Sequence, residues 1–163
     1  MAGPGFAIPA RLLLACCLAA AAAPIPAHAQ QPAAIPGTAV PDSFIINKLI
    51  WSAMAALDQA NQTGNYSVLR DLGAPGFQAN NSAATLGAIF QTLRSQQIDL
   101  GYTLLVGPNL ETSPAIVEGG LLRIRGSFPL RPVPIGFDLL YENVAGQWRI
   151  FGMAVVPLVQ TSG

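Results

Sequence analysis

Residues 121–128 read Leu-Leu-Arg-Ile-Arg-Gly-Ser-Phe and decide how the chain folds. Leucine, isoleucine, glycine and phenylalanine occupy the even positions, whereas arginine and serine occupy the odd positions from Arg123 to Ser127. A period of two is that of a β-strand with one buried face and one face in water. The stretch, extended to residue 130, therefore predicts a strand of a half-buried sheet.

Working outward from this strand, the pattern changes from strands to helices toward the N-terminus. Further strand-like runs, separated by glycine and proline clusters, cover residues 102–106, 115–117, 135–142 and 148–156. Helical spacing predicts helices from residue 42 or 43 to about 61, over 66–72, and from 81 or 82 to about 97, with a turn at 74–76 and an extended piece at 77–79. Helices followed by strands predict an α+β fold, with the N-terminal helices packed on one face of an antiparallel sheet.

The last two predicted strands form a hairpin with two alternative registers. A three-residue loop over 144–146, with glycine in the left-handed conformation, pairs Tyr141 with Arg149. A two-residue loop would instead pair Glu142 with Arg149 and turn Phe151 to the opposite face. The glycine position favours the three-residue loop.

The N-terminal residues have the layout of a secretory signal. Arg11 precedes an apolar run over residues 12–23, and small residues stand at positions −3 and −1 before a predicted cleavage after Ala29. A run of about 12 apolar residues is too short to span a membrane, which takes roughly 20. Residues 13–16 read Leu-Leu-Ala-Cys and offer the alternative of a lipoprotein anchored through Cys16. We therefore expect an exported protein, periplasmic or secreted.

The domain organisation follows from the signal. Residues 1–29 are the predicted signal peptide, residues 30–41 a flexible tether rich in proline and alanine, residues 42–158 a single domain, and residues 159–163 a tail. No later segment is long and apolar enough to predict a transmembrane helix.

Removing the signal limits the available chemistry. Cys16, Cys17 and His28 are the only cysteines and the only histidine of the chain, and all three precede the cleavage point. The exported part therefore excludes Ser-His-Asp catalysis, Cys-His catalysis and ordinary zinc sites, and we expect no cofactor and no metal. Loss of Arg11 leaves seven basic against eight acidic residues, so there is no positive field for nucleic acid.

The order of elements resembles a known superfamily. A long helix, a short helix ending in Leu-Gly-Ala-Pro-Gly-Phe at 72–77, a third helix and a terminal Gly-Gln-Trp-Arg-Ile-Phe-Gly strand at 146–152 are similar to the nuclear transport factor two-like, or ketosteroid isomerase-like, superfamily. The resemblance covers about residues 43–158. It implies a cone in which a curved sheet wraps the first helix and leaves a pocket at its open end.

What the resemblance implies about function is broad. Members include isomerases, polyketide cyclases, dehydratases, transport factors and binding or assembly modules, so the fold alone does not select among them. The catalytic members use Asp, Tyr or His inside the cone. This chain has no histidine after the signal and no tyrosine on its long first helix, which disfavours an enzyme.

The candidate ligand-binding residues lie on the terminal hairpin. In the three-residue register, Phe137, Tyr141, Phe151 and Met153 share the concave face, and Arg149 lies near the phenol. An apolar wall with one phenol and one guanidinium suits a mostly hydrophobic ligand that carries one polar group.

These observations predict an exported, non-catalytic domain that binds a small apolar ligand or a protein partner in the cell envelope. One alternative is an isomerase- or cyclase-like enzyme using Asp138 or Tyr141, and another is a structural module that forms a homodimer through the outer face of the sheet. Strand alternation places Asp138 on that outer face, as a cross-strand partner for Arg123 or Arg125. A useful base would need a raised pKa in a closed pocket.

Overall fold

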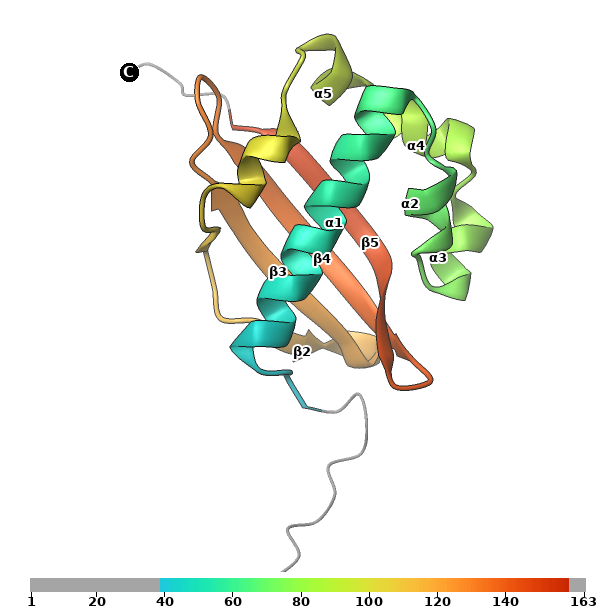
Figure 1. The fold of residues 1–163 in the computed structure, drawn as a ribbon. Coiled ribbons are helices and arrows are strands. Elements are labelled where there is room, and N and C mark those ends of the chain that lie inside the picture. Colours follow the sequence, from blue (N-terminus) through green and yellow to red (C-terminus); the bar gives the residue numbers. More distant parts are fainter. Residues whose placement is uncertain (1–38, 159–163) are drawn as a thin grey trace, which may run out of the picture. The chain divides into compact units, whose positions relative to one another are not determined.

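A computed structural model describes residues 39–158 of the 163-residue chain. The predicted signal at 1–29, most of the predicted tether and the predicted tail at 159–163 lie outside the described residues. The fold is α+β, with helices first and an antiparallel five-stranded sheet after them (Figure 1). None of the helices within residues 39–158 is long and apolar enough to cross a membrane.

The helical part comprises α1 (Ser43–Thr63), α2 (Ser67–Asp71), α3 (Pro75–Asn80), α4 (Ala83–Ile89), α5 (Gln91–Ser95) and the 3₁₀ helix η1 (Leu100–Leu104). The sheet part comprises β1 (Asn109–Leu110), β2 (Ala115–Val117), the 3₁₀ turn η2 (Glu118–Gly120), β3 (Leu121–Phe128), β4 (Ile135–Val144) and β5 (Gln147–Pro157). The strand order is β1-β3-β4-β5, and β2 also pairs with β3.

Helix α1 forms as predicted and lies across one face of the sheet (Figure 1). It begins where the Asp42 carboxylate accepts the backbone N–H of Ile45 at 2.9 Å, and it ends at Gly64, whose φ of 70° is left-handed. Its buried residues are Ile46, Leu49, Ile50, Ala53, Met54, Leu57 and Ala60. This wide apolar face encloses the helix against the sheet, as expected for a helix apolar over most of its circumference.

Strand β3 confirms the alternation from which the fold was predicted. Leu122, Ile124 and Phe128 are buried, whereas Arg123 and Arg125 are exposed. Gly126 also faces the core, where a Cβ would collide with the Phe137 ring and with a β1 carbonyl. The buried side of β3 therefore packs toward α1 and the opposite side carries the charges.

The extended piece predicted at 77–79 is wrong, because these residues belong to α3. Ala74 has extended backbone, Pro75 takes the first helical position, and Gln78 N–H donates to the Ala74 carbonyl at 3.0 Å. Proline at the first position has its φ preset for a helix and lacks only an N–H that would have no partner there.

The strand predicted at 102–106 is also wrong, because the chain forms η1 instead. The Asp99 carboxylate accepts the N–H of Gly101 at 2.8 Å, and Leu100 and Thr103 are buried one 3₁₀ turn apart. The Trp51 indole N–H donates to the Thr103 carbonyl at 3.0 Å, which fastens η1 to α1. The predicted third helix forms as two pieces, α4 and α5, which meet at Phe90.

The hairpin adopts the two-residue loop, so the favoured three-residue register is wrong. Ala145 and Gly146 have φ values of 51° and 84°, both positive as in a type I′ turn, whose twist matches that of the flanking strands. The Asn143 side chain accepts the Gly146 N–H at 2.9 Å, and Val144 pairs with Gln147. The sequence did not predict this turn because Ala145, its first residue with a positive φ, is not of the Asn, Asp or Gly type that type I′ turns favour.

A β-bulge further along the hairpin changes the register again. Tyr141 pairs with Ile150 and Leu140 pairs with Gly152, so Phe151 has no partner on β4. Beyond the bulge, Leu139 pairs with Met153, which places these two on the same face. The extra residue thus returns the distal half of β5 to the parity that the three-residue loop would have produced.

Candidate functional site

A pocket of about 410 Å³ lies between α1, the α2–α3 junction and the β4–β5 hairpin, and we call it the α1–hairpin pocket. Its lining residues are Ile45, Lys48, Leu49, Ser52, Ala53, Leu72, Tyr141, Gly146, Gln147, Trp148 and Ile150. Three segments distant in sequence therefore build it.

One helix face supplies the first wall. Ile45, Lys48, Leu49, Ser52 and Ala53 follow the spacing i, i+3, i+4, i+7, i+8, which puts them on one side of α1. Leu49 and Ala53 are buried, whereas Lys48 and Ser52 are exposed. The wall is thus apolar at its base and polar where it meets the solvent.

The sheet supplies the second wall. Tyr141 on β4 donates its hydroxyl hydrogen to the Leu49 carbonyl at 2.8 Å and is almost wholly buried. Burial raises the pKa of the Tyr141 phenol far above its usual value, so this group stays protonated at all ordinary pH. Its hydroxyl ties β4 to α1, and Ile150 and Trp148 extend the wall along β5.

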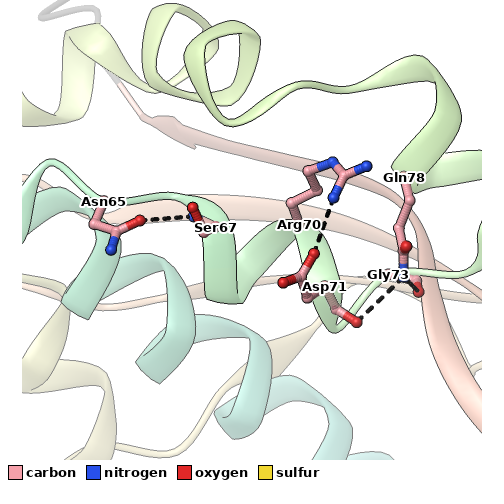
Figure 2. A network of polar contacts seen from close by, with 6 residues as sticks. All are labelled: Asn65, Ser67, Arg70, Asp71, Gly73 and Gln78. Atoms are coloured by element: carbon pink, nitrogen blue, oxygen red, sulfur yellow. Dashed lines mark hydrogen bonds and ion pairs between the residues drawn. The ribbon is translucent and has the colours of Figure 1, made fainter.

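The α2–α3 junction supplies the third wall through Leu72. Ala74 N–H donates to the Ile150 carbonyl at 2.8 Å, and Gly73 forms an isolated bridge with the same residue. Figure 2 shows the Gln78 amide reaching the carbonyls of Gly73, at 2.9 Å, and Asp71, at 3.3 Å. A Cβ on Gly73 would collide with the Phe77 ring. The junction is therefore held firmly beside β5.

The five residues predicted to line one wall separate in the structure. Only Tyr141 lines the α1–hairpin pocket. Phe137 is buried in the core beside Phe128, and Met153 packs half-buried against the same core. Arg149 lies opposite Glu142 and lines a different groove, next to Pro75, while Phe151 is 40% exposed at the bulge. The two-residue turn and the bulge move Arg149 and Phe151 off the face of Tyr141, whereas Phe137 and Met153 keep that face but lie further along the sheet, outside the pocket.

The α1 wall was missed by sequence reasoning, although a signal for it exists. A lysine and a serine four residues apart interrupt an otherwise apolar helix face. Residues at this spacing are neighbours on the helix surface. Lys48 and Ser52 therefore form a polar patch on an otherwise apolar helix, which could have indicated the pocket.

Asp138 lies on the outer face of the sheet, where strand alternation placed it. Arg123 Nε donates to Asp138 Oδ1 at 3.0 Å, and Arg125 Nε lies 3.5 Å from Asp138 Oδ2. The hydrogen bond from Arg123 holds the pKa of Asp138 below its usual value. The carboxylate is therefore ionised, paired and away from the α1–hairpin pocket.

A second groove, of about 400 Å³, lies at the other end of α1, and we call it the α1–α5 groove. It is lined by Asp58, Asn61, Gln62, Leu93, Arg94, Gln97, Ile98 and Asp99. Burial, and then repulsion by Asp99, raise the pKa of Asp58. Asn61 Nδ2 and Arg94 Nε are buried without a hydrogen-bond partner among residues 39–158. Within the same residues, no group of three Asp, Glu, His or Cys side chains could hold a metal ion.

Comparison with known proteins found no relative of this chain. The chain matches no protein-family model, and neither a curated protein nor a solved structure shows significant similarity to it.

Proposed function

We propose that this domain is an exported, non-catalytic binding protein that holds a small, mostly apolar molecule in the α1–hairpin pocket. The observation that carries the proposal is the pocket itself. Its volume of about 410 Å³ falls within the range of small-molecule sites, and most of its lining side chains are apolar. Export rests on the signal-like layout of residues 1–29.

Membership of the nuclear transport factor two-like superfamily is part of the same proposal. It is supported by a long first helix lying across an antiparallel sheet, with shorter helices between them in sequence. The proposed pocket lies beside that first helix.

Binding without turnover is supported by the groups that the pocket contains. No Asp, Glu, His or Cys lines it, so the usual general bases are missing from its walls. The Tyr141 phenol already donates to the Leu49 carbonyl, and its raised pKa opposes proton loss. For Asp138 to act as a catalytic base in the pocket, its carboxylate would have to break its contacts with Arg123 and Arg125 and move from the outer face of the sheet to the inner one.

A blocking substitution tests the site. Titration calorimetry with octanol should show binding to the wild type, and Ser52→Phe should weaken it by roughly tenfold or more, because the ring would fill the mouth of the pocket. Gln59→Phe is the matched control, since Gln59 is an exposed α1 residue outside the pocket. Equal affinities of the two variants would contradict the proposed site.

The same titration, extended to a panel of apolar ketones and acids, also tests for turnover. Emission of Trp148, followed in a Trp51→Phe background, should change on binding because Trp148 lines the pocket. Mass spectrometry of recovered ketones and acids should find them unaltered. Conversion that Asp138→Asn abolishes would replace the binding proposal with the enzyme alternative.

Processing of the N-terminus tests export separately. Mass spectrometry of the protein recovered outside the cytoplasm should find a chain that starts at Gln30. A chain starting at a lipidated Cys16 would instead support the anchored alternative.

A further inference from the structure

We infer that the molecule held in the α1–hairpin pocket is an amphipathic monocarboxylate, whose carboxylate binds Lys48 and whose hydrocarbon part lies against Leu49, Trp148 and Ile150. This inference rests on the proposed function, and it names the chemical class of the ligand.

The charge of the pocket is one-sided. Lys48 is its only charged lining residue, and no carboxylate lines it. Lys48 is also the only lysine of the chain, and it forms no ion pair with any Asp or Glu of residues 39–158. An ammonium beside apolar walls attracts an anion more strongly than one in open water, because the effective dielectric constant is lower there. The pocket therefore favours a ligand with a single negative charge.

Two further polar groups of the pocket complete the recognition of a carboxylate. Ser52 follows Lys48 by four residues on α1, so their side chains are neighbours on the helix surface. The Ser52 hydroxyl and the Gln147 amide, which also line the pocket, form no side-chain hydrogen bond with any residue of 39–158. A carboxylate offers two acceptor oxygens and can take one hydrogen bond from the ammonium and another from the hydroxyl or amide.

The rest of the wall offers a ligand little besides apolar contact. The Tyr141 hydroxyl hydrogen is donated to the Leu49 carbonyl, so this residue presents mainly its ring. Leu49 and Ile150 are buried at the base, and Trp148 is half-buried beside them. An acid group at the exposed rim with a hydrocarbon chain below it satisfies both parts of the pocket.

The test compares three probes of equal chain length, namely octanoate, octanol and octylamine, by titration calorimetry. The wild type should bind octanoate roughly tenfold more tightly than octanol, since a hydrogen bond to a charged group is stronger than a neutral one. Lys48→Met should remove this preference, and Lys48→Arg should keep it. Arg131→Met removes an exposed positive charge from the β3–β4 loop, outside the pocket, and should leave the preference intact.

A spectroscopic readout locates the anion independently of affinity. Reductive methylation with isotope-labelled formaldehyde keeps the positive charge and labels Lys48 as the only side chain, besides the N-terminal amine, because the chain has one lysine. Octanoate should shift this lysine resonance and octanol should not.

The outcomes separate the inference from the proposed function. Equal affinity for octanoate and octanol, or a preference for octylamine, would overturn the inference and leave the binding function standing. Failure of all three probes to bind would overturn both. An octanoate preference that survives Lys48→Met would also overturn the inference, and the melting curve of that variant shows whether it is folded.

Discussion

Helix α1 lines two grooves of nearly equal volume and opposite chemistry, about 410 Å³ at its first half and about 400 Å³ at its second half. The α1–hairpin pocket is mainly apolar, with a single cation. The α1–α5 groove contains two carboxylates, an arginine and three side-chain amides, and only Leu93 and Ile98 are apolar. Cavity size therefore says little about which groove serves a ligand.

The partners of the polar groups separate the two grooves more clearly. In the α1–α5 groove, Gln62 donates to Asp58 at 2.7 Å and Asp99 caps η1 through the Gly101 N–H, and the backbone N–H groups of this segment act to lower the pKa of Asp58. The first two bonds stay within α1 and within the start of η1, and the Trp51 indole fastens η1 to α1. In the α1–hairpin pocket, Tyr141 is bonded to the Leu49 carbonyl. Lys48, Ser52 and Gln147 form no side-chain hydrogen bond within residues 39–158 and stay available to a ligand.

The largest expected effects test whether both grooves share one core. Phe90, near the α1–α5 groove, and Phe137, in the sheet, are 2% and 4% exposed. Truncating either to alanine should cost about 3–5 kcal/mol of unfolding free energy, because each leaves a cavity. Chemical denaturation should still show one transition, and Val156→Ala on an exposed position is the control. Two separate transitions would mean that the grooves belong to independently folding parts.

Effects of intermediate size on stability are expected from alanine substitution of two glycines, Gly73 near the α1–hairpin pocket and Gly87 near the α1–α5 groove. Gly73→Ala should cost about 1–3 kcal/mol and weaken ligand binding, because its Cβ collides with the Phe77 ring at the α2–α3 junction. Gly87→Ala in α4 should be neutral or stabilising by roughly 0.5–1 kcal/mol, because its Cβ meets the Tyr66 ring at an ordinary 3.4 Å and alanine favours helix. Thermal melting of both variants checks the contrast. Equal destabilisation would contradict it.

The smallest effect concerns the charge of the α1–α5 groove. Because the pKa of Asp58 is raised in the folded state, the folded protein retains a proton that the unfolded chain has released. Stability from this group is complete below the unfolded pKa of about 4 and is lost as pH rises through the folded pKa. Asp58→Asn should therefore raise the melting temperature at about pH 7, and the difference from wild type should shrink toward about pH 3. A constant difference across this range would contradict the raised pKa.

The fold was largely predictable from the sequence because its main elements carry strong local periods. The alternation around Arg123 and the long apolar face of α1 each specify one element and its buried side. The elements that were missed depend on distant partners. η1 forms where Trp51 and Asp58 meet its backbone, and α3 forms where Pro75 begins a helix beside β5.

The candidate site was much less predictable than the fold. Of the predicted residues, Tyr141 alone lines the pocket. The other walls, formed by α1 and Leu72, were not predicted because only tertiary packing brings them to the hairpin. The Asn143 side chain at the turn and the unpaired Phe151 in β5 determine the hairpin register. Neither feature can be read from the alternation of apolar and polar residues along a strand.

Because Phe151 is unpaired, β5 should tolerate the deletion of a residue better at this position than elsewhere. Gln147 to Ile150 pair with β4 on one side of Phe151, and Gly152 to Pro157 pair on the other. Deleting Phe151 would join the two halves into a regular ladder and leave every other pairing unchanged. Deleting Met153 would instead pair Phe151 with Leu140 and leave Gly152 opposite Leu139, so the core would lose the Met153 side chain. Phe151 thus has the properties of an inserted residue that the sheet accommodated, and it marks the position in β5 where a relative one residue shorter could keep the same core.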